Sequence, residues 1–483
     1  MIIPHPDNPS QKAHIALLLL AGFLFILPSL NDGLVSDDYE LIEEGRITGV
    51  EDVWTFFTEP GHKGFYRPIP RLLLGANQAV HGLSPFGYHL LNAVLHLAMS
   101  LAVYRLACRI SRHPGISLAT SVLFAVHFIH VEPVYWVSAR NELLVALIYI
   151  SILLLILRSD LMSCMWAWGL FLLGLWCKET AMTVPFAVGL LTIYRETGSP
   201  RDRVRHGIRV SFPFWLILMG FAAVRWSVGA DWPWTSQEIG FGIHPFLILK
   251  NLGQYSIQLL LPVRSLLDIF GSDTYPDMTQ IVRSGGSIST GMMLIILSIA
   301  FILVTIMGAL LKTGGPTARI GLTFALLTAL PYLMMQGTGL RYMYLPSAGF
   351  LLAFVVGAKA VMDTWGKSRF TRRHLYLMTL PVALSLLVTL DQTRWWDQAG
   401  RIADQVVEQV GTQATVPGIP LYVFNIPRRL HGAYIFHNGF EAAMRFYTLK
   451  RMSDIYDGDR ILEQNGVIPD GVAVFHLGYI EGF

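Results

Sequence analysis

The chain has 483 residues, of which 53% are hydrophobic, 12% aromatic and only 14% charged. Soluble globular proteins carry roughly 25% charged residues, so the composition excludes a water-soluble enzyme, a disordered chain and a disulfide-rich secreted module. A formal net charge of +3 is too small to indicate a nucleic-acid partner. The composition therefore predicts a polytopic α-helical membrane protein whose partners include membrane lipids.

Apolar segments that could cross a bilayer as helices recur along the chain, each near the length of about 20 residues that a crossing needs. We predict eleven, at residues 14–30, 87–108, 115–131, 141–157, 163–177, 181–195, 210–228, 290–311, 319–335, 341–361 and 374–390. The first has no A-x-A-like cleavage site, so we expect an uncleaved anchor. A further apolar stretch at 245–263 has polar residues at helical spacing, which favours a re-entrant or interfacial helix.

Lys and Arg are distributed unequally between the connecting loops. A cytoplasmic N-terminus places most of them inside, whereas the first outer loop, 31–86, has nine acidic residues and only four Lys or Arg. We therefore predict a transmembrane domain at 1–391 with a cytoplasmic N-terminus and outer loops at 31–86 and 229–289. The remaining residues, 392–483, are predicted to form a small α/β module on the outer face, with strands at 421–427 and 472–479 and a helix around 440–450.

Two adjacent carboxylates, Asp37 and Asp38, follow the first predicted span directly. Such a pair just above an apolar helix suits a general base, a metal ligand or the recognition of sugar hydroxyls. A solvated acidic loop with an aspartate helix cap accounts for the same residues equally well. A divalent ion could be held by Asp37, Asp38 and Glu132 if they converge, which their spacing leaves open.

Ionisable residues at the edge of a membrane are costly and therefore mark candidate functional sites. Besides the two aspartates, the candidates on the outer face are Arg67, His130, Glu132, Arg140, Lys178, Arg341 and Tyr344. Arg341 begins a predicted span, and an arginine at a helix N-terminus suits a phosphate group. The alternatives are a snorkelling side chain for Lys178 and a headgroup anchor for Arg341.

Carboxylates and cations on one face suit the transfer of a group from a lipid phosphate to a hydroxyl. A carboxylate would remove the hydroxyl proton, while the cations stabilise the departing phosphate, and such charge stabilisation is often the largest catalytic contribution.

Several sequence elements, in this order, resemble the GT-C glycosyltransferases, membrane enzymes that use polyprenyl-phosphate-linked sugars. Within that superfamily the likeness is to the transmembrane and tetratricopeptide-repeat O-mannosyltransferases and their bacterial relatives. It covers the chain from the first span to 341–361. The elements are Asp37-Asp38, YRP (66–68), GYHLLNAVLH (87–96), HxxHVEPVYWVSARNELL (127–144), KET (178–180) and RYMYLP (341–346).

The resemblance implies a GT-C-like catalytic domain with about eleven spans, in the bacterial inner membrane with the C-terminal module periplasmic. It implies inverting transfer of a hexosyl or pentosyl group, from a polyprenyl-phosphate-linked donor to a hydroxyl acceptor at the outer face. The resemblance assigns to Asp37 the role of catalytic base or acceptor-binding acid, with Asp38 beside it. Arg341, Lys178 and Arg140 carry the role of donor-phosphate ligands.

The tetratricopeptide repeats of that group are missing, so the sugar and the acceptor, whether glycan, lipid or protein, stay open. A lipid-linked sugar flippase or transporter, and a ligase or polymerase of lipid-linked glycans, remain as alternative functions. The short C-terminal module could bind an acceptor or cap the cavity.

Overall fold

The computed structural model describes residues 9–232, 234–235, 240–262, 265, 305, 308–309, 311–365, 372–412, 419–447, 455–469 and 472–478. The predicted span at 290–311 and residues 266–289 of the second outer loop lie almost entirely outside the described residues.

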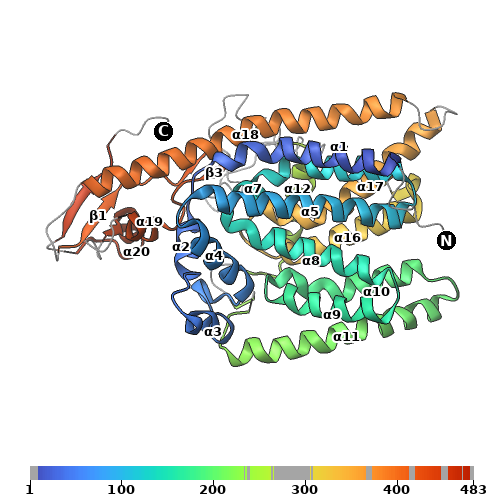
Figure 1. Ribbon diagram of the computed structural model, residues 1–483, viewed down its shortest axis with the longest axis horizontal. Coiled ribbons are helices and arrows are strands. Elements are labelled where there is room, and N and C mark those ends of the chain that lie inside the picture. Colours follow the sequence, from blue (N-terminus) through green and yellow to red (C-terminus); the bar gives the residue numbers. More distant parts are fainter. Residues whose placement is uncertain are drawn as a thin grey trace.

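Long helices packed side by side make up most of the molecule, and shorter helices and strands gather at one end of this bundle (Figure 1). The bundle helices are α1 (Pro9–Ile26), α5 (Pro85–Ser111), α6 (Pro114–Ala125), α7 (Val131–Tyr135), α8 (Arg140–Ile156), α9 (Leu161–Leu175), α10 (Val184–Arg195), α11 (Pro200–Ser227), α12 (Pro245–Leu260), α16 (Gly315–Leu333), α17 (Tyr344–Trp365) and α18 (Arg372–Thr412). Short 3-10 helices lie at Leu27–Asn31, His62–Gly64, Phe128–His130, Val137–Ala139, Glu179–Thr183 and Leu340–Met343.

Several of these helices are long and apolar enough to cross a membrane, judged by length and composition. Within the described residues they number five, at Ser10–Asn31, Pro85–Ser111, Val137–Ile156, Pro200–Ser227 and Leu340–Asp363. The bent pair Pro114–Ala125 and Phe128–Tyr135, with 45° between its halves, would make a sixth. The chain is thus a polytopic α-helical membrane protein, while the predicted number of eleven spans stays unconfirmed.

Some predicted spans form helices that are shorter than a bilayer requires. At 1.5 Å per residue, the 15 residues of α9 extend only about 22 Å, against about 30 Å of hydrocarbon. The predicted span at 181–195 is divided between a 3-10 helix and the 12-residue α10. Apolar composition therefore located these segments without fixing the length of their helices.

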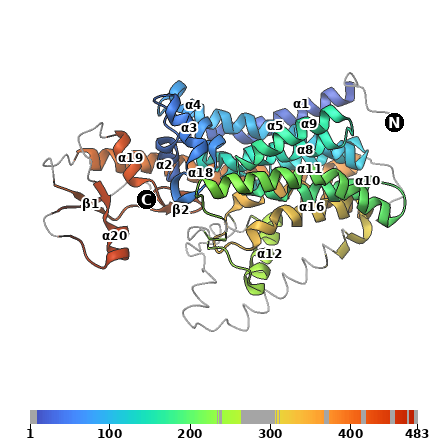
Figure 2. The same cartoon turned by 90° about the horizontal axis from the view of Figure 1, so that it is seen from below.

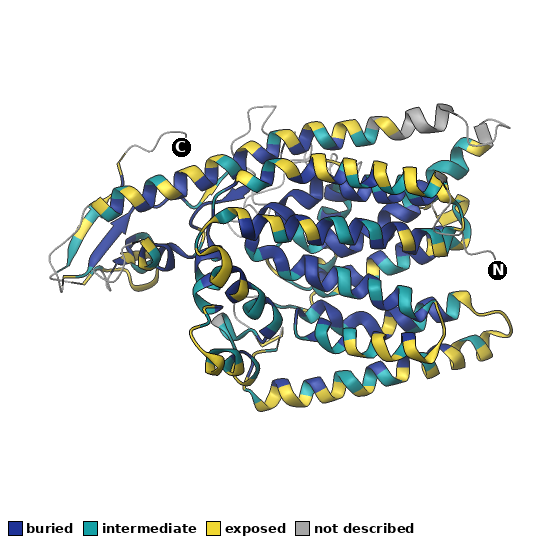
Figure 3. Cartoon of the chain, viewed as in Figure 1, coloured by how far each residue is buried: buried dark blue, intermediate teal, exposed yellow. Residues whose placement is uncertain are grey.

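The outer helices expose apolar side chains, as a lipid-facing surface requires. On α1, Leu17, Leu20 and Leu24 are each about half exposed, and their spacing places them on one side of the helix. Figure 3 shows this exposed surface along α1, α11 and α18, around a buried centre. Inside, α16 and α17 approach closely at Gly321 and Gly349, where added side-chain atoms would meet the facing backbone.

The first loop folds into three helices at one end of the bundle: α2 (Asp37–Glu44), α3 (Val50–Thr58) and α4 (Pro68–His81). Pro68 and Pro70 lie in the first turn of α4, where proline costs no hydrogen bond and favours helix initiation. The loop therefore presents Asp37 and Asp38 at a helix N-terminus rather than on irregular chain.

The last bundle helix, α18, has 41 residues and runs without a break through the predicted domain boundary at 391/392. Trp395 and Trp396, which would suit a membrane-interface position, are instead buried on α18. The Trp395 ring stacks on His431 at 5.2 Å, and the Trp396 ring lies 6.2 Å from that of Tyr434. This helix thus joins the bundle to the C-terminal strands.

Beyond α18 the chain forms a small sheet with two short helices, at the left of Figure 1. The elements are β1 (Leu421–Phe424), β2 (Arg429–Leu430), β3 (Ala433–Tyr434), α19 (Phe440–Tyr447), β4 (Ile455–Asp457), α20 (Gly458–Asn465) and β5 (Ala473–His476). The parallel sheet has the order β4-β1-β5, with Leu421 of β1 opposite Ile455 and Ala473. β1 is buried throughout, as a central parallel strand should be. Figure 2 shows this sheet standing beyond the end of the helical bundle.

Candidate active site

Asp37 lies in the first turn of α2, partly exposed, where the helix dipole favours a negative charge. Its Oδ1 atom accepts a hydrogen bond of 2.7 Å from Nδ2 of Asn438, which precedes α19. The next residue, Gly439, donates its backbone N–H to Glu40 Oε1 at 3.0 Å. Among the described residues Oδ2 of Asp37 has no hydrogen-bond donor, so it can accept a proton from a substrate.

Ser36, directly before Asp37, has a left-handed backbone conformation with φ 50°. For a residue other than glycine such a conformation costs about 1–3 kcal/mol and needs support from its surroundings. That support comes from the C-terminal segment: Ser36 N–H donates to the Ile435 carbonyl at 2.7 Å, and Ser36 Oγ accepts from Asn438 N–H at 3.2 Å. The C-terminal residues thus set the direction in which the first turn of α2 begins.

Asp38 has a different environment, since only 1% of it is exposed. Its Oδ1 accepts two hydrogen bonds from Ser138, 2.7 Å from the backbone N and 2.5 Å from Oγ, and its Oδ2 accepts one of 3.0 Å from Val35 N–H. Burial raises the pKa of Asp38 to about 7, although the Ser138 hydrogen bonds act in the opposite direction. Asp38 therefore ties the first loop to the bundle, whereas the carboxylate of Asp37 is partly exposed.

A second group of charges lies at the same end of the bundle, and we call it the cation cluster. It consists of Arg67, Lys178, Arg225 and Arg341 with the carboxylates of Glu132, Glu142 and Glu179. Each cation has a carboxylate partner: Arg341 pairs with Glu132, Lys178 with Glu142, and Glu179 serves both remaining arginines. Four cations against three carboxylates leave one excess positive charge.

The cluster is largely withdrawn from water, so its charges act strongly on one another. Burial lowers the pKa of Lys178 to about 8, with Arg67 and Arg341 acting in the same direction and Glu142 against it. Burial alone would raise the pKa of Glu179, but the charges of Arg67 and Arg225 lower it to about 2. Glu179 is therefore firmly ionised, whereas an anion bound beside Lys178 would stabilise the charged form of that lysine.

Aromatic rings line the cluster and hold its cations in place. The Tyr342 ring centroid lies 4.6 Å from Arg341 Cζ and 5.3 Å from Lys178 Nζ. Tyr332 donates its hydroxyl to Glu142 Oε2 at 2.9 Å. These cation–π contacts add about 1 kcal/mol each and restrict where the cations point.

The helix α12 supports the chain that leads to Arg341. Its Asn251 side chain donates to the carbonyls of Leu333 and Met335 at 3.0 and 2.8 Å. Gln254 donates to Thr338 Oγ1 at 3.1 Å. The polar stripe predicted for 245–263 therefore anchors the turn between α16 and α17.

Tyr434 connects the two parts of the site. Arg341 Nη1 donates to its hydroxyl at 3.3 Å, and its ring lies 4.5 Å from the ring of Trp136 and 5.7 Å from that of His437. Burial lowers the pKa of His437, with Arg429 acting in the same direction and Asp37 against it. Since His437 adjoins Asn438, a short series of contacts leads from the cation cluster to Asp37.

The structure places Arg140 outside the cation cluster, so its predicted role in phosphate binding stays a prediction that this geometry does not support. Its guanidinium is 1% exposed and donates to Asn92 Oδ1 at 2.8 Å, Asn77 Oδ1 at 3.2 Å and the Tyr88 carbonyl at 2.9 Å. With these donors engaged inside the bundle, Arg140 joins α8 to α4 and α5. It is a structural residue in this arrangement.

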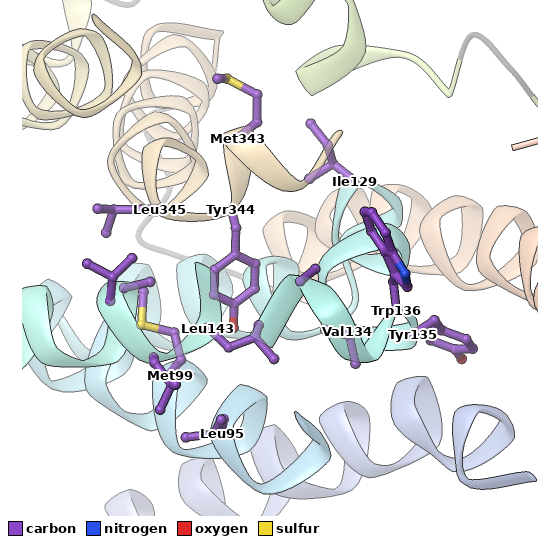
Figure 4. Close-up of a cluster of buried hydrophobic side chains, with 14 of the residues drawn as sticks. Leu95, Met99, Ile129, Val134, Tyr135, Trp136, Leu143, Met343, Tyr344 and Leu345 are labelled. Carbon is purple, nitrogen blue, oxygen red and sulfur yellow. The ribbon is translucent and has the colours of Figure 1, made fainter. Parts of the chain in front are cut away.

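His130 and Tyr344 also occupy the core rather than a cavity. His130 lies fully buried, its Nδ1 2.7 Å from the Phe124 carbonyl and its Nε2 2.9 Å from Ser347 Oγ. The Tyr344 hydroxyl lies 2.9 Å from His96 Nδ1, and Figure 4 shows its ring projecting from the start of α17 toward Leu143. Both side chains are satisfied internally and are not available to a substrate.

The residues suggested for a metal ion do not fit one. Among the residues that the structure describes, no group of three or more His, Cys, Asp or Glu side chains is arranged to hold a metal. Asp38 is engaged by N–H and O–H donors, and Glu132 accepts from the Leu340 N–H and pairs with Arg341.

Sequence reasoning missed two members of the cluster as site residues, Glu142 and Glu179. Glu179 directly follows Lys178, and Glu142 lies two residues after Arg140. The sequence feature that could have revealed them is an acidic residue close to a basic one at the edge of a membrane span, because each unpaired charge there would be costly. Which acid pairs with which cation across the helices can be seen only in the three-dimensional structure.

Comparison with known proteins gives sequence relatives of one kind, although no family model matches the chain. Over 233 residues the chain is 31% identical to the protein O-mannosyl-transferase Tmtc1 of Drosophila melanogaster, covering 43% of this chain and 27% of that protein. Over 143 residues it is 35% identical to TMTC3 of Homo sapiens, covering 28% of this chain and 15% of that protein. Over these stretches the chain is similar in sequence to the protein O-mannosyl-transferases.

The predicted resemblance to these O-mannosyl-transferases is thereby confirmed. A longer match extends over 290 residues of Tmtc2 of Drosophila melanogaster, at 27% identity, and covers 54% of this chain and 30% of that protein. The chain thus spans less than a third of the length of the relatives it matches.

Solved structures show a weaker likeness. The oligosaccharyltransferase AglB of Archaeoglobus fulgidus, solved with an inhibitory peptide and a dolichol-phosphate, has a TM-score of 0.49 at 11% identity and covers 92% of this chain and 65% of that one. ArnT of Cupriavidus metallidurans, bound to undecaprenyl phosphate, has a TM-score of 0.47 at 12% identity and covers 97% and 90%. Both scores lie below 0.5.

Proposed function

We propose that the chain is a membrane glycosyltransferase of the GT-C type. It transfers a sugar, with inversion, from a polyprenyl-phosphate-linked donor to a hydroxyl acceptor. The observation that carries this proposal is the pair of sites at one end of the bundle: a carboxylate with a free oxygen at Asp37, and a cation cluster with one excess positive charge. The relationship to the protein O-mannosyl-transferases supports it.

Asp37 acts as the general base. Its Oδ2 atom takes the proton of the acceptor hydroxyl while Asn438 holds Oδ1. The acceptor oxygen then attacks the anomeric carbon from the side opposite the phosphate, and the new glycosidic bond forms as the bond between carbon and phosphate oxygen breaks. The sugar therefore inverts, and the proton ends on Asp37.

The cation cluster binds the phosphate of the donor and stabilises it as it leaves. We assign Arg341 and Lys178 to this phosphate, with Arg67 beside them. The excess positive charge of the cluster comes from Arg67 and Arg225, which share the single carboxylate of Glu179. Preorganised charge in a site that excludes water is worth more than the same charge in solvent. The paired glutamates keep the cations fixed in the absence of donor, so little reorganisation is needed at the reaction.

The test is transfer by the purified full chain in detergent, with a mannosyl polyprenyl phosphate and a pentosyl polyprenyl phosphate as donors. Asp37→Asn should abolish transfer while donor binding and expression stay near normal. Glu51→Gln is the matched control, because it makes the same carboxylate-to-amide change at an exposed position of the same loop. Near-normal turnover by Asp37→Asn would refute the mechanism.

The same assay separates the alternative functions. Transfer in detergent, where no sidedness exists, excludes a pure flippase. A ligase or polymerase would require an oligosaccharide on a diphosphate carrier and would be inactive with a monophosphate sugar. The acceptor can be sought by supplying hydroxyl-bearing peptides, glycans and lipids in parallel.

A further inference from the structure

A large cavity opens at the end of the bundle opposite Asp37, near the N-terminus of the chain in Figure 1. Its volume is about 1230 Å³, and it lies between the ends of α1, α5, α8, α10 and the start of α16. The proposed glycosyl transfer uses none of its residues. Its lining is nevertheless rich in one kind of charge.

Five arginines line this cavity: Arg105, Arg109, Arg112, Arg158 and Arg195. No Asp or Glu lies among the described residues that line it. Of the five guanidinium groups, only that of Arg195 has a hydrogen-bond partner within the described part of the chain, donating to the Leu157 carbonyl and Ser159 Oγ. Arg105 and Arg109 are four residues apart on α5, where like charges destabilise a helix. Within the described residues, the cavity lining therefore supplies positive charge without a carboxylate to balance it.

The lining below these arginines is apolar. Leu154, Leu155 and Leu157 of the α8 end contribute to the wall, together with Leu191 and Ile320. A soluble anion such as a nucleotide would gain little from such a wall, whereas an acyl chain would be buried against it. The combination of a basic rim and an apolar wall matches an amphiphile with a phosphate headgroup.

We propose that this cavity is a binding site for the phosphate group of a membrane lipid, with an anionic phospholipid as its occupant. Arg105, Arg109 and Arg112 bind the headgroup, since they are exposed and unpaired. The acyl chain lies along the end of α8. The site is separate from the donor site, and its occupation stabilises the packing of α5 against α8.

The test measures lipid binding to the purified full chain by native mass spectrometry. Phosphatidylglycerol should bind more tightly than phosphatidylcholine, and the double substitution Arg105→Gln/Arg109→Gln should weaken phosphatidylglycerol binding roughly five-fold for each arginine removed. Arg201→Gln/Arg209→Gln is the matched control, since these exposed arginines of α11 lie outside the cavity lining. The control should bind phosphatidylglycerol as the unmodified chain does.

Competition identifies the source of the phosphate. If a polyprenyl phosphate displaces bound phosphatidylglycerol at a lower concentration than phosphatidylglycerol itself does, the ligand of the cavity is a lipid phosphate of the polyprenyl type. That result would overturn the assignment to a phospholipid. Displacement by inorganic phosphate at similar concentration would overturn the lipid assignment altogether. If both double variants lose phosphatidylglycerol affinity to the same extent, the loss is due to the general surface charge of the protein. That result would also overturn the proposed site.

A second measurement does not depend on variants that might fold poorly. A phosphatidylglycerol analogue with a photoreactive group in its acyl chain should label the peptide containing Leu154–Leu157. Labelling confined to other lipid-facing helices, such as α11, would contradict the proposed orientation of the lipid.

Discussion

The side-chain amide of Asn438 donates a hydrogen bond of 2.7 Å to Oδ1 of Asp37, although 401 residues separate the two in sequence. The Ile435 carbonyl accepts from Ser36 N–H at the same helix end, and Gly439 N–H donates to Glu40. Together these contacts make the C-terminal segment part of the proposed active site. The segment thus does more than cover the bundle, because it orients the carboxylate that accepts the proton.

Replacement of Asn438 by alanine should lower kcat by about 10- to 100-fold, since small displacements of a catalytic group have effects of this size. The donor KM should stay within about two-fold, because Asn438 does not touch the cation cluster. Steady-state kinetics at varied donor concentration check both. Asn465→Ala, an exposed change at the end of α20, serves as the control. Unchanged kcat in Asn438→Ala would remove this residue from the mechanism.

Replacement of Arg341 by alanine should raise the donor KM at least ten-fold. It also leaves Glu132 buried without its partner, at a cost of about 3–5 kcal/mol in unfolding free energy. The double variant Glu132→Gln/Arg341→Gln removes both charges and should recover most of this stability without recovering donor affinity. Donor titration and thermal unfolding separate the two effects. If the double variant recovers donor affinity as well, Arg341 serves only to anchor the helix.

Replacement of Arg140 by alanine should act on stability rather than on donor binding. Asn77, Asn92 and the Tyr88 carbonyl would lose their donor inside the bundle, at a cost of roughly 2–3 kcal/mol in unfolding free energy. The donor KM of the folded fraction should be unchanged. A large rise in that KM would restore the predicted role of Arg140 in phosphate binding.

Donor binding should weaken above about pH 8. Burial lowers the pKa of Lys178 to about 8, so its positive charge is half lost at that pH and the attraction for the phosphate falls. An arginine stays protonated throughout this range, so Lys178→Arg should bind donor with little change between pH 7 and pH 9. Donor KM measured at several pH values checks this. The same alkaline weakening in Lys178→Arg would assign the titration to another group.

The sequence was sufficient to locate the polar residues of the site but not to assign their partners. Asp37, Lys178 and Arg341 stand out because charges are rare in an apolar chain, and all three lie at one end of the bundle. Arg140 has the same appearance in sequence, yet its donors are taken up by Asn77 and Asn92 on other helices. Whether a cation is free or satisfied depends on packing across helices, which periodicity does not reveal.

Helix boundaries show the same limit. The predicted strand at 421–427 includes β1, and the helix predicted around 440–450 includes α19, because their local patterns are strong. The continuation of α18 past residue 391 was not foreseen, because polar residues replace apolar ones where the helix leaves the bundle. The fall in hydropathy near residue 391 shows where the helix passes into more polar surroundings, but it does not show where the helix ends.

Because α18 is one continuous helix, a small tilt in its middle would displace its C-terminal end. Gly400 meets Gly33 at close range, and a side chain on either would collide with the facing backbone. From that contact to Thr412 the helix extends about 18 Å, so a tilt of only about 10° would move its end by about 3 Å. Such a movement would open the bond between Asn438 and Asp37. Gly400→Ala should therefore slow sugar transfer, measured as kcat, from a position that contacts neither substrate nor any charged residue of the site.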